Sequence, residues 1–398
     1  MRNTQRFQIY WLGQTLSGFG DAFALVAIPL LVLDATHSVA CMGLISAAGV
    51  GAQVAASFFS GTIVDRVNRR VLMLACDFCR AGVYGLVPLA AWFQHVPLAL
   101  LYFVMIAGGC LANIFSVAYM TAVPSLVQQD SLHSANAKLQ GSLAFAYVLG
   151  SMAGGSVASM ANPAGALSID AVTFLISALS LTVIRFDSVT SAAGKADDTS
   201  FGSGLRFLWK HSLLRDMTCI IVLLGLTGNI GVGAGITDLM IYHVRYELNQ
   251  GPTYVGICIG IVALGAVLGA VVAPKLSRLA GSGWCFLSGN FVQAAGLVTL
   301  GIMHRFDAAC IGGLLWGAGM MMRGVPMNTL RQTLIPNELL GRVTALSWTA
   351  ILMASAAGTA IITRLASLSS AATVLTQVGL GVVVIGFGAL AYPTIRRG

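Results

Sequence analysis

Charged side chains are the scarcest class in this sequence, at 9% of its 398 residues. A soluble domain usually carries about 25% charged residues, so the composition excludes an ordinary soluble protein. Hydrophobic residues make up 57% of the chain, and the mean hydropathy is +0.84. Apolar runs of about 18 or more residues recur along the sequence, which is the length a helix needs to cross a bilayer. The chain is therefore expected to be an all-α integral membrane protein.

Several missing patterns narrow the function. No Gly-Lys-Ser/Thr follows a glycine-rich stretch, so ATP is not the expected energy source. The eight cysteines lie scattered in apolar runs, and the Cys76-x-x-Cys79 spacing has no histidine or second cysteine pair to make a metal site. No basic run is interleaved with aromatic residues, which argues against nucleic-acid binding. We expect no cofactor and no metal.

Twelve membrane spans are predicted, with both termini in the cytoplasm. Arg245, Arg305 and Arg364 then fall outside, Arg80 and Arg323 fall within spans, and the other seventeen of the 22 cationic residues fall inside. Lys and Arg are retained on the inner side of membranes, so this sorting fixes the orientation. The spans lie near residues 8–33, 41–64, 71–93, 97–122, 135–160, 164–186, 215–244, 253–276, 283–303, 307–330, 342–364 and 370–393.

The spans divide into two halves of six, with domains at 1–186 and 215–398. Residues 187–204 are small and polar and predict a flexible cytoplasmic linker. Residues 205–215 mix apolar and basic residues at helical spacing, which predicts a short helix in the inner interface within the linker region 187–214. Residues 126–132 resemble 334–340 at an offset of 208. Such a repeat predicts a duplicated six-span unit.

The densest charge cluster follows the second predicted span. It reads Gly61-Thr-Ile-Val-Asp65-Arg66-Val-Asn68-Arg69-Arg70. A cytoplasmic loop that fixes topology would explain the arginines, but it would explain neither Asp65 nor Gly61. The pattern resembles the loop signature of the major facilitator superfamily, in which a second glycine stands where this chain has Asn68. We expect Asn68 to take the left-handed turn in its place.

Further stretches narrow this resemblance. Residues 11–21, 204–215 and 325–343 are similar to the branch that holds bacterial macrolide-efflux proteins and the enterobactin exporter. The resemblance implies two pseudo-symmetric six-helix bundles that alternate between inward-open and outward-open states. It also implies that Gly61, Asp65, Arg66, Arg69 and Arg70 form an inner-gate motif. The chain departs from the proton-antiporter pattern, because its fourth span lacks an arginine and its fifth lacks the usual Gly-Pro.

Four charged residues lie deep in the predicted spans. Asp21 is near mid-membrane, where a carboxylate costs about 2.5–3.5 kcal/mol, so it is a candidate proton-coupling site; the alternative is a packing role. Asp77 and Arg80 can pair on one helix face and are expected to belong to the inner gate. Arg323 either receives an anionic substrate or pairs with a carboxylate. Asp170 and Asp238, nearer the outer side, are expected in outer-gate pairs.

Neutral side chains in the spans either line a cavity between the halves or join helices by hydrogen bonds. With Arg323, the candidates for the substrate cavity are Gln14, Asn113, Tyr119, Asn229, Trp316 and Trp348.

We therefore expect a secondary transporter that exports a small amphiphilic organic molecule, drug-like or siderophore-like, across the bacterial inner membrane. Proton antiport is the expected energy source, and the expected functional unit is a monomer in the lipid bilayer. Import or facilitated diffusion of a metabolite is the alternative. A membrane enzyme is less favoured, because no nucleophile–base grouping converges in the spans. A sensor is also less favoured, because it would need a sizeable soluble output domain, and the sequence shows none.

Overall fold

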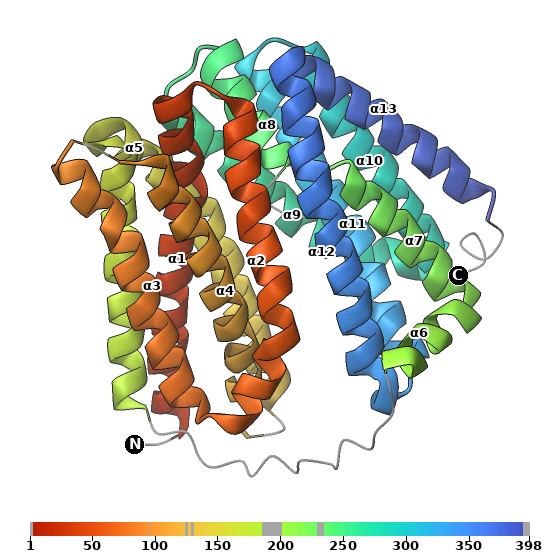
Figure 1. The fold of residues 1–398 in the computed structure, drawn as a ribbon. Coiled ribbons are helices and arrows are strands. Elements are labelled where there is room, and N and C mark those ends of the chain that lie inside the picture. The colour runs from red at the N-terminus through yellow and green to blue at the C-terminus, as the bar shows by residue number, and fades with distance from the viewer. Residues whose placement is uncertain are drawn as a thin grey trace. The chain divides into compact units, whose positions relative to one another are not determined.

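A computed structural model describes residues 3–94, 96–123, 126–128, 131–184, 201–228 and 235–392, and all regular structure in these ranges is helical (Figure 1). Ten of the helices are long and apolar enough to cross a membrane. The all-α membrane fold predicted from the sequence is confirmed. The helices before the linker are α1 (Asn3–Thr36), α2 (Val39–Arg66), α3 (Arg69–Trp92), α4 (Leu98–Ala122) and α5 (Leu132–Val183).

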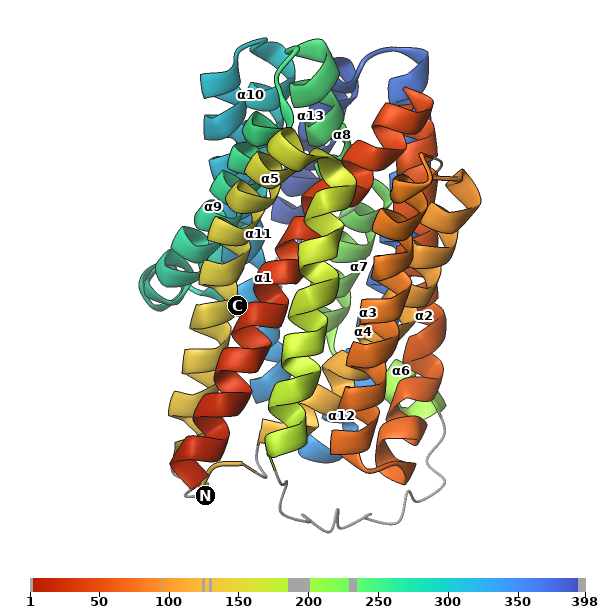
Figure 2. The same cartoon turned by 90° about the vertical axis from the view of Figure 1, so that its left-hand side faces the viewer.

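Helix α5 contains two of the predicted spans. Asn162 has φ 65° and ψ 164°, and Pro163 follows it, so the helix is interrupted at this point. Figure 2 shows the two arms, 132–161 and 163–183, meeting at one end and running back in opposite directions. Asn tolerates positive φ better than most residues, and the proline ring disfavours helical geometry in the residue before it.

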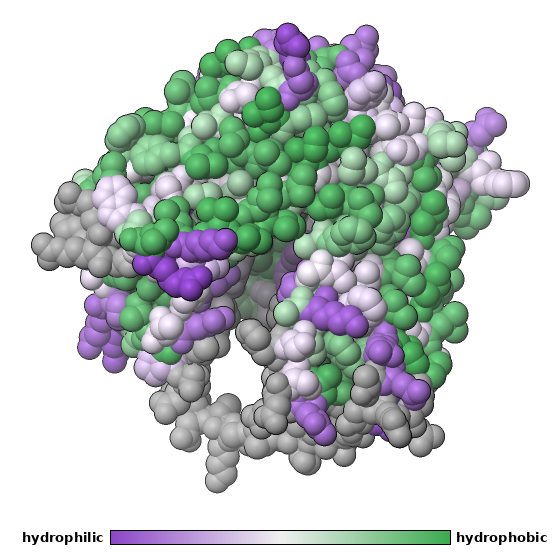
Figure 3. Space-filling view, turned by 180° about the vertical axis from the view of Figure 1, so that it is seen from behind, coloured by the Kyte–Doolittle hydropathy of each residue, from purple (hydrophilic) through white to green (hydrophobic). Residues whose placement is uncertain are grey.

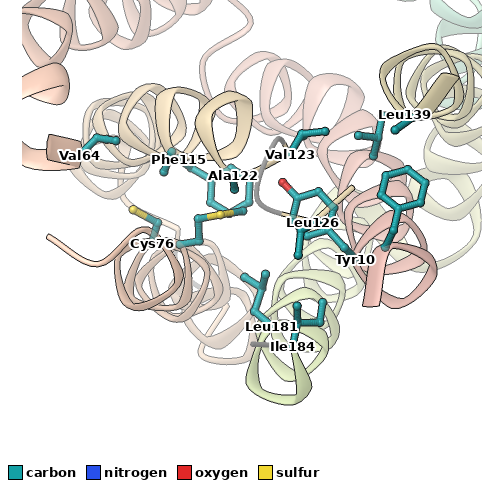
Figure 4. Close-up of a cluster of buried hydrophobic side chains, with 14 residues drawn as sticks. Tyr10, Val64, Cys76, Phe115, Ala122, Val123, Leu126, Leu139, Leu181 and Ile184 are labelled. Atoms are coloured by element: carbon teal, nitrogen blue, oxygen red, sulfur yellow. The ribbon is translucent and has the colours of Figure 1, made fainter. Parts of the chain in front are cut away.

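The first helical unit comprises residues 1–37, 48–194 and 251–260. Helix α1 packs along α5, and α3 packs against both α4 and α5. A buried cluster closes the end of this unit where α1 begins (Figure 4). Its members come from every helix of the first half and include Tyr10, Cys76, Leu139 and Leu181. The cluster fixes the rotation of α1, α3 and α5 and so sets which of their side chains face one another.

The second unit comprises residues 38–47, 195–250 and 261–398. Its helices are α6 (Phe201–Lys210), α7 (Ser212–Leu226), α8 (Ile236–Tyr242), α9 (Pro252–Ala280), α10 (Ser282–Ile302), α11 (Phe306–Leu334), α12 (Asn337–Leu368) and α13 (Ala371–Leu390); the first residues of α9 belong to the other unit. Helices α10 and α11 are in direct backbone contact, because a Cβ added to Gly296 would lie 2.5 Å from the Gly312 carbonyl oxygen.

The predicted span 215–244 is not one continuous helix. Helix α7 ends at Leu226, and α8 begins at Ile236. Gly228 and Gly235 have φ of 66° and 60°, a conformation that a regular helix cannot contain and that glycine adopts without strain. The π-helical turn His243–Glu247 then extends α8. With α5 counted as two crossings and α7 with α8 as one, the described helices supply the twelve crossings predicted.

Glu247 joins this turn to α13. Its carboxylate accepts hydrogen bonds from the backbone N–H groups of Ala371 (2.6 Å) and Ala372 (3.0 Å) and lies 2.5 Å from Nδ1 of His243. Burial by itself would raise the pKa of Glu247. The hydrogen bonds from His243 and the two backbone groups outweigh burial and hold that pKa below its usual value.

Large apolar side chains cover much of the described surface, as expected for helices that face lipid. Phe103, Leu179, Val384 and Phe387 are each at least half exposed. Figure 3 shows a broad hydrophobic area on one face, with hydrophilic residues gathered toward its margins. A soluble monomer rarely exposes a contiguous apolar patch larger than several hundred Å². The surface therefore agrees with the membrane location inferred from composition.

Candidate functional site

Asp21 of α1 forms an ion pair with Arg80 of α3 inside the first unit. The Arg80 side chain is 5% exposed, and that of Asp21 is 29% exposed. The sequence analysis placed Arg80 with Asp77 at the inner gate and did not pair it with Asp21. The structure instead joins Asp21 of α1 to Arg80 of α3.

Aromatic rings hold the guanidinium of Arg80 in place. Its Cζ lies 3.9 Å from the ring centroid of Phe174 and 5.9 Å from that of Phe115. A cation over an aromatic face gains about 0.5–2 kcal/mol, more where water is excluded. The rings therefore compensate part of the cost of burying the arginine, and they fix it beside the second arm of α5.

Two further carboxylates lie near this pair. Asp77 and Asp170 have no exposed surface. Among the described residues, no hydrogen-bond donor lies in bonding geometry with any of their four carboxylate oxygens. Asp77 stands one turn before Arg80 on α3, but the predicted pair between them does not form, because Arg80 pairs with Asp21. Asp170 was expected in an outer-gate pair, but it lies within electrostatic reach of Asp21 and Arg80.

Asp170 touches the backbone of α1 because the neighbouring residue there is glycine. A Cβ added to Gly20 would lie 2.6 Å from Oδ1 of Asp170 and 2.0 Å from Oγ1 of Thr173. Any larger residue at position 20 would displace the carboxylate. The sequence signal for this approach is the glycine directly before Asp21, which the sequence analysis did not interpret.

Among the candidate cavity residues of the first half, two serve as links between helices. Nε2 of Gln14 donates to Oγ of Ser177 at 3.0 Å, and Oδ1 of Asn113 accepts from Oγ of Ser60 at 2.6 Å. The third, Tyr119, stacks on Tyr10 with ring centroids 5.8 Å apart, at the edge of the buried cluster.

The inner-gate motif spans the end of α2 and the start of α3. Asn68 has φ −58°, so the left-handed turn predicted there is wrong; its side chain instead caps α3 by accepting from the N–H of Arg70 at 3.0 Å. Nε of Arg70 donates to the carbonyl oxygen of Leu181 at 2.8 Å, and its Nη2 donates to that of Thr182. A cation at the carboxyl end of a helix is stabilised by the helix dipole. Arg70 thereby ties α3 to the end of α5.

Other residues of this motif make fewer described contacts. A Cβ at Gly61 would meet no atom within 4 Å, so close packing within the described residues does not explain this glycine. Arg66 is exposed, and Arg69 is half-buried. The backbone of Asp65 lies in α2, but its side chain is outside the described part of the structure.

The candidates of the second half are distributed differently. Arg323 is buried, and its Nη1 donates to Oε1 of Gln293 at 2.8 Å. Trp316 is fully buried beside the contact between α10 and α11, so it lines no open surface here. Trp348 is 43% exposed. Asn229 lies outside the described residues.

Asp238, the other carboxylate expected in an outer-gate pair, is buried at the start of α8. It accepts hydrogen bonds from Oγ of Ser46 at 3.1 Å and from the N–H of Gly235 at 3.2 Å. In the described part of the chain, no three His, Cys, Asp or Glu side chains are grouped to hold a metal ion.

The model of the Major Facilitator Superfamily matches residues 10–359. The chain belongs to the Major Facilitator Superfamily. It is therefore a membrane transporter of this superfamily, as its loop motif indicated.

Relatives within the superfamily include exporters. The enterobactin exporter EntS of Escherichia coli O81 (strain ED1a) is 24% identical over 382 residues, covering 96% of this chain and 90% of that protein. The protein of the same name from Shigella boydii serotype 4 (strain Sb227) is 25% identical over the same shares.

Solved structures support the fold. The nucleoside transporter NupG aligns with a TM-score of 0.76 and 12% identity over 98% of this chain and 99% of its own. A bacterial homologue of the iron transporter ferroportin aligns with a TM-score of 0.69 and 18% identity over 98% and 99%. At these identities the likeness extends to the superfamily fold alone.

Proposed function

We propose that this superfamily member exports a small amphiphilic organic molecule, drug-like or siderophore-like, across the bacterial inner membrane in exchange for protons. Support for export comes from the enterobactin exporters, which align over 96% of the chain. In this proposal the transporter works as a monomer by alternating access, with both termini in the cytoplasm.

The Asp21–Arg80 ion pair is the observation that carries proton coupling. A proton that reaches Asp21 removes its charge and so releases Arg80 from its partner. An ionisable pair inside a membrane span is costly and is commonly retained for transport of ions or protons. Asp21 keeps part of its surface exposed, so a proton or a substrate group has access to it.

An amphiphile fits the described polar groups better than a sugar does. A sugar needs many free amide and carboxyl partners for its hydroxyl groups. Three of the candidate cavity residues instead form hydrogen bonds within the protein: Gln14 with Ser177, Asn113 with Ser60, and Arg323 with Gln293. Apolar and aromatic contacts are what these bundles offer in abundance.

Transport in proteoliposomes with an imposed pH gradient tests the proposal. In a panel of dyes, macrolides and siderophores, at least one compound should accumulate when the pH gradient drives protons in the direction opposite to its own transport. Simple hexoses should neither accumulate nor compete with that compound. Import of a metabolite would appear as accumulation in the opposite direction, and it would overturn the proposal.

Asp21→Asn should abolish accumulation driven by the pH gradient and still permit exchange of substrate. The matched control is Asp307→Asn, because that aspartate is exposed and its partner is the exposed Arg305. If Asp21→Asn accumulates substrate as well as the wild type does, Asp21 only joins helices and coupling lies elsewhere.

A further inference from the structure

The interior of the first unit contains more negative than positive groups. Asp21, Asp77 and Asp170 are three carboxylates, and Arg80 is the one cation paired among them in the described structure. If every group were ionised, the arginine would neutralise one carboxylate and leave two buried negative charges. A buried carboxylate without hydrogen-bond donors is so costly that it takes up a proton instead.

The three carboxylates follow one another along the helices. Asp77 adjoins Cys76, a member of the buried cluster near the start of α1, and it interacts with Ser177. Asp170 stands seven residues from Ser177 on the same arm of α5, which is about 10 Å along a helix and on the same face. Arg80 lies over Phe174, midway between these two positions. Beside the ion pair thus lie two further buried carboxylates, neither of which forms an ion pair within the described residues.

We propose that Asp170 and Asp77 hold protons on either side of the Asp21–Arg80 ion pair, and that the three carboxylates form a proton relay through the first unit. The relay rests on the proposed proton coupling and names the residues that perform it. At rest the site contains three carboxyl groups, two protons and one guanidinium, so its net charge is zero. It carries one net negative charge between the release of a proton from Asp77 and the uptake of the next by Asp170.

Each step moves a proton between neighbouring carboxyl groups. Asp170 gives its proton to the Asp21 carboxylate, becomes ionised itself, and takes Arg80 as its partner. Asp77 releases its proton toward the end of the unit where α1 begins, and Asp21 then passes its proton to Asp77. A proton from the opposite side restores Asp170, Arg80 returns to Asp21, and one proton has crossed the site.

Other polar groups face these carboxyl groups without adding charge. Tyr84 of α3, Tyr147 of the first arm of α5 and Thr173 lie around Asp170.

Around Asp77, the neighbouring groups are Tyr10 of α1, Cys76 and Ser177. Phenol, thiol and hydroxyl groups can pass or hold a hydrogen bond while staying neutral. They leave Arg80 as the group that balances the one ionised carboxyl.

Infrared spectroscopy of the purified protein counts protonated carboxyl groups without any substrate. Relative to the wild type, Asp170→Asn, Asp77→Asn and Asp21→Asn should each show one fewer, because Arg80 keeps one of the two remaining carboxylates ionised. Arg80→Gln should show one more, because all three are then protonated. Asp307→Asn should leave the count unchanged. An unchanged count in Arg80→Gln or in the Asp170 and Asp77 variants would overturn the relay.

A second measurement uses the wild type alone, so its result does not depend on whether a variant folds. A hydrophobic carbodiimide reacts with protonated carboxyl groups in apolar surroundings, and mass spectrometry locates the adducts. Asp77 and Asp170 should be labelled and Asp21 spared; labelling of Asp21 in preference to both would overturn the assignment.

Transport then separates the relay from the proposed function. Asp170→Asn and Asp77→Asn should lose accumulation driven by the pH gradient and keep substrate exchange, the same result that we expect for Asp21→Asn. If either variant accumulates substrate like the wild type, the relay is wrong. If no compound of the panel is transported while the carboxyl counts change as expected, the proton sites stand and the proposed substrate class is wrong.

Discussion

Removing the charges of Arg80 and Asp21 together should destabilise the protein less than the sum of the two single changes. Breaking a buried ion pair from one side costs about 3–5 kcal/mol, because a charge remains buried without its partner. Asp21 is 29% exposed, so water relieves part of this cost. We expect a coupling free energy of about 2 kcal/mol between the two residues, near the value for a hydrogen bond to a charged group.

A double-mutant cycle isolates this coupling. Arg80→Gln also loses the cation–π contact with Phe174, which is worth up to about 2 kcal/mol. The double variant Asp21→Asn/Arg80→Gln loses the same contact, so this contribution cancels in the coupling free energy. Denaturant unfolding in detergent gives the four free energies. As a control, Asp21→Asn/Arg70→Gln should be additive, since the Arg70 side chain bonds carbonyl groups of α5. Additivity in the Asp21/Arg80 cycle would refute the ion pair as an energetic unit.

Three further predictions concern other parts of the chain. Glu247→Gln should cost about 1 kcal/mol of stability at neutral pH by weakening the cap of α13. Because the folded-state pKa of Glu247 is lowered, its contribution is present above the usual glutamate pKa of about 4.3 and is lost as pH falls through the folded-state value, so unfolding midpoints of wild type and variant should converge in acid. Convergence on raising the pH would contradict this sign. Gly43→Ala should destabilise by about 1–3 kcal/mol, since the added Cβ would lie 1.9 Å from Oγ1 of Thr363, whereas Gly51→Ala, with nothing within 4 Å, should not. Asp65→Asn should slow transport while leaving the unfolding midpoint unchanged; a wild-type rate would exclude a gating role for this carboxylate.

The sequence predicted the helices and their number because the bilayer imposes a length and a composition on each crossing. Interruptions within crossings were harder to foresee. The segment that contains Gly228 and Gly235 is glycine-rich, yet its hydropathy matches that of a continuous helix. In the described residues, the positive φ angles of Gly228 and Gly235 mark the break between α7 and α8. Asn68 was misassigned for a different reason: an asparagine side chain suits both a left-handed turn and a helix cap, so the residue type does not distinguish the two.

The sequence predicted the charged residues of the candidate site, but it did not predict which of them form an ion pair. The depth of Asp21 and the shared helix face of Asp77 and Arg80 follow from counting residues along helices. The partner of Arg80 depends on how α1 and α3 are rotated about their own axes, which is decided by packing in the buried cluster and by Gly20. The periodicity of apolar residues within a helix does not predict a contact between residues as far apart in the chain as Asp21 and Arg80.

Helix α2 has a consequence for how the protein is made. Residues 38–47 group with the second unit, where Gly43 meets Thr363, although the ribosome makes them long before it makes α12. At roughly 5–20 residues per second, the helix that receives Gly43 emerges tens of seconds later. During this interval the nascent α2 must keep its final docking surface against lipid or an insertion factor, so α12, which is made much later, completes the packing of α2.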